Sequence, residues 1–130
     1  MIAVDTNILV RLLTNDDVTQ AQLAAEIMRQ DDVFLAKTVI LETEWVLRYA
    51  YGLDRSAILD AFKKLLGLEN ILVEAPLTIR QALAWYEQGA DFADALHVAS
   101  CDQADEIFTF DRTLSNKIGS LAGVKIQLLN

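Results

Sequence analysis

The chain has 130 residues, of which 53% are hydrophobic, and a formal net charge of −8. This length suits a single domain over residues 1–130. Charged residues interrupt every apolar run, which excludes a membrane-spanning helix, and the early Asp5 argues against a signal peptide. The acidic balance argues against broad electrostatic adhesion to nucleic acid. Cys101 is the only cysteine, which excludes an internal disulfide and a cysteine-based zinc site. We therefore expect a cytoplasmic protein.

The first half of the chain predicts strands that alternate with helices. A strand-like run over 2–4 ends at Asp5, and Thr6 and Asn7 are suited to cap a helix from Ile8 to Leu13. The spacing of apolar residues then predicts further elements in this order: a helix around 23–28, a strand over 33–36, a helix capped by Thr38 and ending near 51, a helix capped by Asp54 and ended by Gly67, and a strand over 71–73.

The second half continues the alternation. We expect helices over 78–88 and 92–102, a strand over 107–110, a short helix over 111–118 and a last strand over 124–129. Strands that alternate with helices are typical of parallel sheets covered by helices. The sequence thus predicts an α/β fold in three layers (α/β/α) with one mostly parallel sheet of five strands.

Four acidic residues at element ends or in apolar segments carry the functional signal: Asp5, Glu42, Asp94 and Asp111. Asp5 and Asp111 follow strand-like runs, and the carboxyl ends of parallel strands are where ligands bind. Carboxylates that meet there would repel one another by about 3 kcal/mol per pair, at about 5 Å and an effective dielectric of about 20. A divalent cation removes this cost, so the pattern indicates a site for a hard metal ion.

Two aspartates of this set, and the nearby Asp91, also have a purely structural explanation. Asp5, Asp91 and Asp111 precede helices, where an acidic side chain caps the helix and interacts favourably with its dipole. In the functional interpretation, Thr6 and Asn7 would orient Asp5 or a metal-bound water by hydrogen bonding. Each of these residues taken alone has a structural explanation, but their combination with the other acidic residues is less easily explained in this way.

Glu42 and Asp94 differ in how easily a structural role explains them. Glu42 could be an ordinary surface glutamate, which is what we expect of Glu44, two positions further and on another face of the helix. Asp94 has apolar neighbours on both sides, and a buried carboxylate needs a partner or a metal ion. We expect His97, one turn later, to form hydrogen bonds rather than to bind metal.

Taken together, these segments resemble the PIN-domain ribonucleases, and within them the VapC-like toxins of prokaryotic toxin–antitoxin pairs. The resemblance follows the family's order and spacing over nearly the whole chain. The matching segments are Ile2-Ala3-Val4-Asp5-Thr6-Asn7, Glu42 with Trp45-Val46-Leu47, Asp91-Phe92-Ala93-Asp94-Ala95-Leu96-His97, and Thr109-Phe110-Asp111-Arg112.

The resemblance implies a metal-dependent endoribonuclease that forms a homodimer and binds a cognate antitoxin. Its implied ligands for Mg²⁺ or Mn²⁺ are Asp5, Glu42, Asp94 and Asp111, with Asp91 as a secondary acidic position. Thr6 and Thr109 match polar positions near the metal ions. The implied fold, a five-stranded, largely parallel sheet between helices, agrees with the fold predicted from the alternation of elements.

Phosphodiester hydrolysis suits such ligands, because a metal ion lowers the pKa of bound water and neutralises the charge that develops on the phosphate. We expect Asp5, Glu42 and Asp94 to hold the principal ion. Asp111 would bind a second ion or order the attacking water. The basic residues nearest to these segments are candidates for positioning RNA: Arg11, Lys37, Arg48 and Arg112.

Two other classes of function compete with the nuclease. The helices present more apolar surface than one small sheet covers, which would suit a catalytically silent PIN-like module that binds protein; the residues concerned are Leu23, Ile27, Trp45, Tyr49, Phe62 and Leu66. A phosphotransfer protein would also place an aspartate at a strand end. An aspartyl phosphatase, however, needs a second aspartate where this chain has Asn7.

Overall fold

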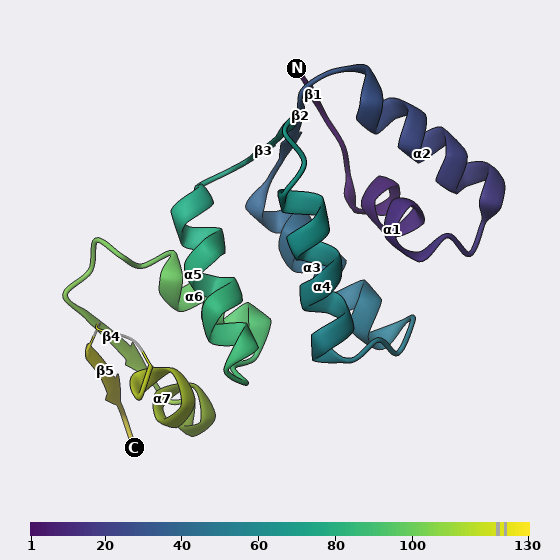
Figure 1. The fold of residues 1–130 in the computed structure, drawn as a ribbon. Coiled ribbons are helices and arrows are strands. Elements are labelled where there is room, and N and C mark those ends of the chain that lie inside the picture. The colour runs from purple at the N-terminus through teal and green to yellow at the C-terminus, as the bar shows by residue number, and fades with distance from the viewer. Residues whose placement is uncertain (122, 124) are drawn as a thin grey trace. The chain divides into compact units, whose positions relative to one another are not determined.

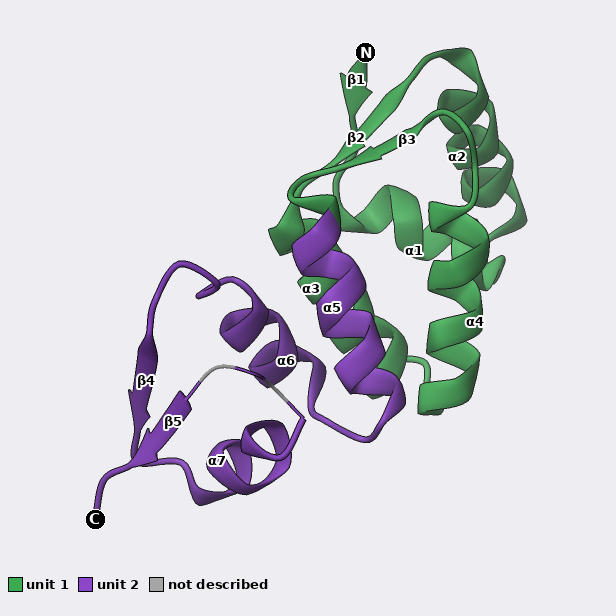
Figure 2. Cartoon of the chain, turned by 60° about the vertical axis from the view of Figure 1, so that its left-hand side comes forward, with its two compact units in different colours: residues 1–76 green, residues 77–130 purple. Residues whose placement is uncertain are grey.

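The computed structural model describes residues 1–121, 123 and 125–130. The chain divides into two compact units, residues 1–76 and residues 77–130 (Figure 2). Strands and helices alternate along the chain, and every strand pair among the described residues is parallel. The predicted α/β class is therefore confirmed.

The first unit contains a sheet whose strands run in the order β1-β2-β3. Residue Ile2 of β1 pairs with Val33 of β2, which pairs with Ile71 of β3. Because the strands are parallel, their carboxyl ends lie at the same edge. The elements of this unit, labelled in Figure 1, are β1 (Ile2–Ala3), α1 (Thr6–Thr14), α2 (Val18–Gln30), β2 (Val33–Leu35), α3 (Lys37–Tyr49), α4 (Arg55–Leu66) and β3 (Ile71–Val73).

The core of the first unit lies around the central strand β2. Val33 and Leu35 are fully buried, as are Ile40 and Leu47 of α3 and Phe62 of α4. Burying one such side chain contributes about 1.5–3 kcal/mol to folding. Helix α1 packs against both α2 and α3, so the segment after β1 is held by two neighbouring helices.

Aspartates cap most helices of this unit through a side-chain oxygen that accepts a backbone N–H. Asp54 caps α4 as predicted, with Oδ1 2.9 Å from the nitrogen of Ala57, and Gly67 follows the helix. Helix α1 is capped by Asp5 rather than by Thr6 and Asn7, which already lie inside the helix. The structural interpretation of Asp5 as a cap is confirmed, and the prediction that Thr6 and Asn7 cap this helix is wrong; aspartate and threonine are both good capping residues.

Helix α3 begins in a way that the local sequence does not reveal. Its cap residue is Ala36, and the predicted cap, Thr38, lies inside the helix. The backbone nitrogen of Lys37 donates to the Glu74 carboxylate at 2.9 Å, from just after β3. A carboxylate at a helix amino terminus is favoured by the helix dipole. The prediction that Thr38 caps this helix was wrong. The group that binds the amino terminus of the helix is the Glu74 carboxylate, which is distant in the sequence and could not be recognised from the local pattern.

The second unit contains a short parallel pair of strands. Glu106 of β4 pairs with Lys125 of β5, and Thr109 pairs with Leu128. The predicted strand over 124–129 includes Val124, which lies outside the described residues. The elements are α5 (Pro76–Glu87), α6 (Phe92–Ala99), β4 (Glu106–Thr109), α7 (Arg112–Gly119) and β5 (Lys125–Leu128).

The predicted single sheet of five strands is wrong for the described residues. Their five strands form one sheet of three strands and another of two. Strand β1 has only two residues, and the others have three or four. The alternation of strands and helices indicates which segments are strands, but it does not determine which strands pair. No helix in this part of the chain is long and apolar enough to cross a membrane.

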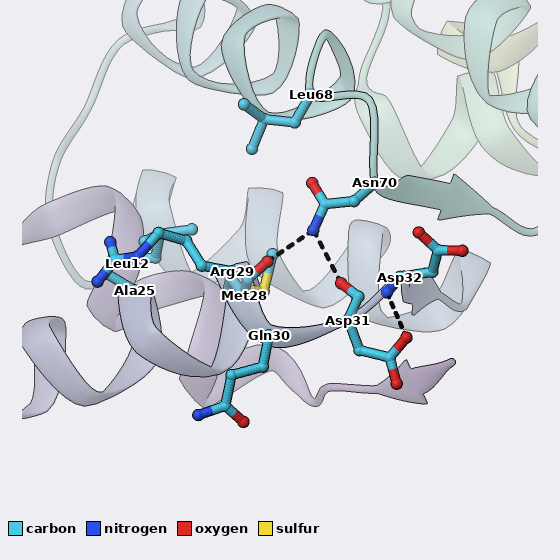
Figure 3. Close-up of a pocket in the computed structure, with 9 residues that line it drawn as sticks. All are labelled: Leu12, Ala25, Met28, Arg29, Gln30, Asp31, Asp32, Leu68 and Asn70. Carbon is cyan, nitrogen blue, oxygen red and sulfur yellow. Dashed lines mark hydrogen bonds between the residues drawn. The ribbon is translucent and has the colours of Figure 1, made fainter.

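A pocket of about 590 Å³ lies at the amino end of the three-stranded sheet (Figure 3). Asn70, which precedes β3, donates from its side-chain amide to the carbonyl oxygen of Met28 at 2.7 Å and to that of Asp31 at 2.9 Å. Carbonyl groups at the end of a helix have no partner within the helix. Asn70 therefore closes the carboxyl end of α2 from across the pocket.

Candidate functional site

Asp5 lies at the surface, at the carboxyl end of β1. Its backbone is extended, with φ −93° and ψ −179°, and its Oδ1 accepts a hydrogen bond from the nitrogen of Ile8 at 3.3 Å. The structural role as helix cap is thus real. It uses one carboxylate oxygen and holds the side chain at the edge of the sheet where ligands bind in parallel α/β folds.

The first turn of α1 also fixes Glu42. Thr6 is buried, and its hydroxyl group donates a hydrogen bond to Oε1 of Glu42. Glu42 is exposed on α3, as the functional interpretation requires. The first unit therefore joins two of the four predicted ligands, because Glu42 is bonded to the residue that follows Asp5.

Glu44 is the clearest error among the acidic residues. We expected it to face solvent, but its side chain is 1% exposed. Its carboxylate accepts hydrogen bonds from Arg48, 2.8 Å from Nε and 3.2 Å from Nη2. The helical spacing of Ile40, Glu44 and Leu47 places all three on the buried face, and Arg48 one turn later was the sequence signal for the ion pair.

The second unit brings the other acidic residues together at the starts of two helices. Asp91 caps α6, with Oδ2 3.1 Å from the nitrogen of Asp94. Asp111 caps α7, with Oδ1 3.0 Å from the nitrogen of Leu114. The hydroxyl oxygen of Thr109 accepts a hydrogen bond from the nitrogen of Asp111 at 2.9 Å.

Asp94 shows how these carboxylates influence one another. Burial raises the pKa of Asp94 above its ordinary value, the negative charges of Asp91 and Asp111 raise it further, and His97 acts in the opposite direction. A bound cation would relieve this repulsion. The surplus of negative charge and the all-oxygen donor set therefore fit a hard divalent ion such as Mg²⁺ or Mn²⁺.

The described residues of each unit lack a cluster of metal-binding side chains. Within each unit, the described residues form no group of three or more Asp, Glu, His or Cys side chains that could hold one ion. Asp5 and Glu42 belong to the first unit, and Asp91, Asp94 and Asp111 belong to the second. The four predicted ligands are thus divided into two pairs, each with its own supporting threonine.

Arg11 and Arg48 are both bound to side chains of the first unit. Arg11 is 3.0 Å from the carboxylate of Asp16 and also donates to Gln20 and to the hydroxyl group of Tyr51. Arg48 is bound to Glu44. Each guanidinium group is therefore oriented by its own unit, and binding RNA would require it to share these partners.

A groove of about 470 Å³ borders Asp5 between α1 and α2. Its polar side includes Asp5, Asn7 and Arg11, and its apolar side includes Leu23 and Ile27. Both of these apolar residues are exposed, as are Trp45 and Tyr49 of α3, whereas Phe62 is fully buried. The prediction of uncovered apolar helix faces is confirmed for α2 and α3.

Comparison with known proteins assigns this chain to a family. The PIN domain family model matches residues 2–118, a range that contains all four predicted ligands. The chain belongs to the PIN domain family, which confirms the resemblance drawn from its sequence. This membership supports a hydrolase of the nuclease class.

One similar solved structure is a toxin, VapC20 of Mycobacterium tuberculosis, described as cleaving the sarcin–ricin loop. It is 24% identical, with a TM-score of 0.45, and the match covers 89% of this chain and 94% of that chain. A comparison with curated proteins found no match.

Proposed function

We propose that this protein is a Mg²⁺- or Mn²⁺-dependent endoribonuclease in which Asp5, Glu42, Asp94 and Asp111 bind the metal. The observation that carries the proposal is the PIN domain match, which spans all four residues. The charge around Asp94 supports it, because the carboxylates of the second unit are arranged at an electrostatic cost that a cation would offset.

Several side chains around the proposed metal ligands have supporting roles. A bound divalent ion would supply water of lowered pKa and neutralise the charge that develops on the phosphate. Thr6 orients the Glu42 carboxylate, and Thr109 holds the backbone of Asp111. Asp91 adds negative charge beside Asp94. We propose RNA rather than DNA as the substrate, and this choice rests on the resemblance to PIN-domain ribonucleases.

The test compares two helix-capping aspartates. Asn caps helices about as well as Asp, so Asp5→Asn and the matched control Asp54→Asn should both fold like the wild type. We expect Asp5→Asn to abolish RNA cleavage that depends on Mg²⁺ or Mn²⁺, and Asp54→Asn to leave it unchanged. Wild-type cleavage should stop when EDTA is added. Cleavage that persists in EDTA or in Asp5→Asn would refute the proposal.

We further propose that the protein is the toxin of a toxin–antitoxin pair, acting in the cytoplasm as a homodimer. The antitoxin would present a basic or aromatic segment, because the chain carries a net charge of −8 and one side of the groove beside Asp5 is apolar. An arginine of that segment would reach the carboxylates. Substituting Leu23→Asp in the groove should weaken antitoxin binding and leave RNA cleavage by the free protein intact.

The competing function is a catalytically silent module that binds protein. The exposed apolar residues of α2 and α3 favour it, because such patches mark interaction surfaces. The same cleavage assay separates the two functions. Absence of cleavage with every RNA class and both metals, by protein that is folded, would favour the module.

A further inference from the structure

An aromatic pair occupies the exposed face of α3. Trp45 is 54% exposed and Tyr49 is 63% exposed. They lie one helical turn apart, with ring centroids 5.1 Å apart and ring planes inclined by 45°. Leaving two large aromatic side chains exposed side by side forgoes part of the stabilisation that their burial would give. This cost suggests that the pair has a ligand.

The ion pair between the buried Glu44 and the partly exposed Arg48 holds the Tyr49 ring in place. Glu44, at 1% exposure, holds the guanidinium group of Arg48 through two nitrogens. The carbon of that guanidinium group lies 4.5 Å from the ring centroid of Tyr49, and Nη1 donates to the Tyr49 hydroxyl group at 3.2 Å. The Tyr49 ring is therefore fixed before any ligand arrives, which lowers the entropy cost of binding.

The aromatic pair lies on the same face of α3 as the proposed metal ligand Glu42. Residues Glu42, Trp45 and Tyr49 follow one another at i, i+3 and i+7, which places them on one face of a helix. All three are exposed. Steps of three and four residues correspond to rises of about 4.5 and 6 Å along the helix axis. A strand cleaved beside Glu42 would thus have its flanking bases within reach of the two rings.

We propose that Trp45, Tyr49 and Arg48 form a stacking platform for the bases of single-stranded RNA, adjoining Glu42. The proposal rests on the proposed ribonuclease function and adds how its substrate is held. Aromatic rings and guanidinium planes stack on unpaired bases whatever their identity. Stacking also suits an acidic protein, because it needs no excess of positive charge.

The platform itself carries no net charge. The net charge of −8 repels phosphates in general. The platform is different, because Arg48 and Glu44 neutralise each other and the two rings carry no charge. Aromatic residues and arginine are also common at protein interfaces. Continuity with Glu42 makes RNA the ligand we propose, and a protein partner is the outcome that would replace it.

Binding should be measured without metal, so that no RNA is cleaved. The probe is a short single-stranded oligouridylate in EDTA, and the signal is tryptophan fluorescence. The chain has two tryptophans, and Trp85 is only 8% exposed, so quenching by the probe reports mainly on Trp45. We expect quenching by the single strand, and little by a duplex whose bases are already paired and stacked.

Variants of the platform should weaken this binding in a graded way. Loss of one stacked base costs about 1–3 kcal/mol, so Trp45→Ala and Tyr49→Ala should each weaken affinity by about 5- to 140-fold, measured by fluorescence anisotropy of a labelled probe. Trp45→Phe should retain most of the affinity. The matched control is Phe108→Ala, which removes a 61% exposed aromatic side chain from β4 and should change nothing.

The outcomes separate this proposal from the ribonuclease function. If Asp5→Asn abolishes cleavage but binds the probe normally, and Trp45→Ala raises KM with little change in kcat, both proposals stand. If wild-type protein binds the probe but never cleaves RNA, the platform stands and the ribonuclease function fails. Unchanged affinity in Trp45→Ala overturns the platform. If that variant also changes the sedimentation coefficient of the protein, this face of α3 is an interface between copies of the chain.

Discussion

Thr6 donates a hydrogen bond to Oε1 of Glu42, a residue 36 positions away in the sequence. Thr6 opens α1, and Glu42 lies in the middle of α3. The bond fixes the orientation of a carboxylate that is otherwise exposed on its helix. It also joins Glu42 to the segment that begins with Asp5, so the geometry of two proposed ligands depends on one hydroxyl group.

Thr6→Ala should therefore weaken metal binding without unfolding the protein. Groups that orient a metal ligand typically contribute 10- to 100-fold to metal affinity or activity, so we expect a loss of roughly that size in a titration of cleavage rate against Mn²⁺. Thr6→Ser keeps a hydroxyl donor and should retain most of the affinity. A Thr6→Ala variant with wild-type metal affinity would show that Glu42 needs no such support.

Arg48→Ala tests the ion pair beneath the aromatic pair. The change deprives the buried Glu44 carboxylate of its bidentate partner, and we expect the free energy of unfolding to fall by about 1–3 kcal/mol, because Glu44 is buried but Arg48 is partly exposed. The matched control is Lys64→Ala, which breaks an i,i+4 pair with Asp60 whose partners are both well exposed.

Urea denaturation monitored by circular dichroism provides the measurement for both variants. Lys64→Ala should lower the free energy of unfolding by no more than about 0.5 kcal/mol. Equal effects of the two substitutions would mean that burial of Glu44 adds nothing to its pairing with Arg48. A larger effect of Arg48→Ala would also explain why a glutamate is tolerated at this core position.

Local features of the fold were predictable from the sequence. The segments that form strands and helices, the cap at Asp54 and the surface positions of Asp5 and Glu42 follow from periodicity and capping chemistry, which act within a few residues. The same local rules place Asp91 and Asp111 before helices. These features require no knowledge of the tertiary structure.

Interactions between distant segments were not predictable in this way. Glu74 caps α3 from beyond β3, and Thr6 bonds to Glu42 across two helices and a strand. Strand pairing belongs to the same class, which is why one sheet was expected and the described residues form two. The error for Glu44 has another cause. Its spacing from Ile40 and Leu47 indicates the buried face of the helix, but we expected it at the surface because its side chain is charged.

The carboxylate of Asp16 should make the stability of the first unit depend on pH. A hydrogen bond from the Tyr51 hydroxyl group lowers the pKa of Asp16 most strongly. Desolvation opposes this shift, and Thr14 and Arg11 lower the pKa further, so the net effect is a lowered pKa. Because the pKa is lower in the folded state than in the unfolded state, the ionised form stabilises the fold. This contribution is fully present above the ordinary value of 3.8 and is lost as the pH falls through the lowered value.

Asp16→Asn isolates this contribution. The difference in free energy of unfolding between the wild type and Asp16→Asn should stay constant from neutral pH down to about pH 5 and shrink below about pH 4. Tyr51→Phe removes the largest cause of the lowered pKa. The difference in free energy of unfolding between the wild type and Tyr51→Phe should shrink over the same pH range, but by a smaller amount. The measurement is thermal unfolding at several pH values. A difference that grows as the pH falls would contradict the assignment.

Asn70 offers the sharpest test of how the carboxyl end of α2 is held. Its amide nitrogen donates to two backbone carbonyl groups, those of Met28 and Asp31 (Figure 3). At about 1 kcal/mol for each hydrogen bond, Asn70→Ala should lower the free energy of unfolding by about 2 kcal/mol. Asn70→Asp should lower it further at neutral pH, because a carboxylate would then face two carbonyl oxygens and the neighbouring acidic residues, Asp31 and Asp32.

The control for this prediction is Gln30→Ala, which removes another amide side chain from the lining of the same pocket. Gln30 is exposed, so its loss should change the free energy of unfolding by less than about 0.5 kcal/mol. Urea denaturation at pH 7 and at pH 4 would separate charge from hydrogen bonding, since protonation of the introduced carboxylate in the Asn70→Asp variant restores one donor and should recover part of the stability. If Asn70→Asp were as stable as the wild type at pH 7, the two carbonyl groups would not depend on this amide.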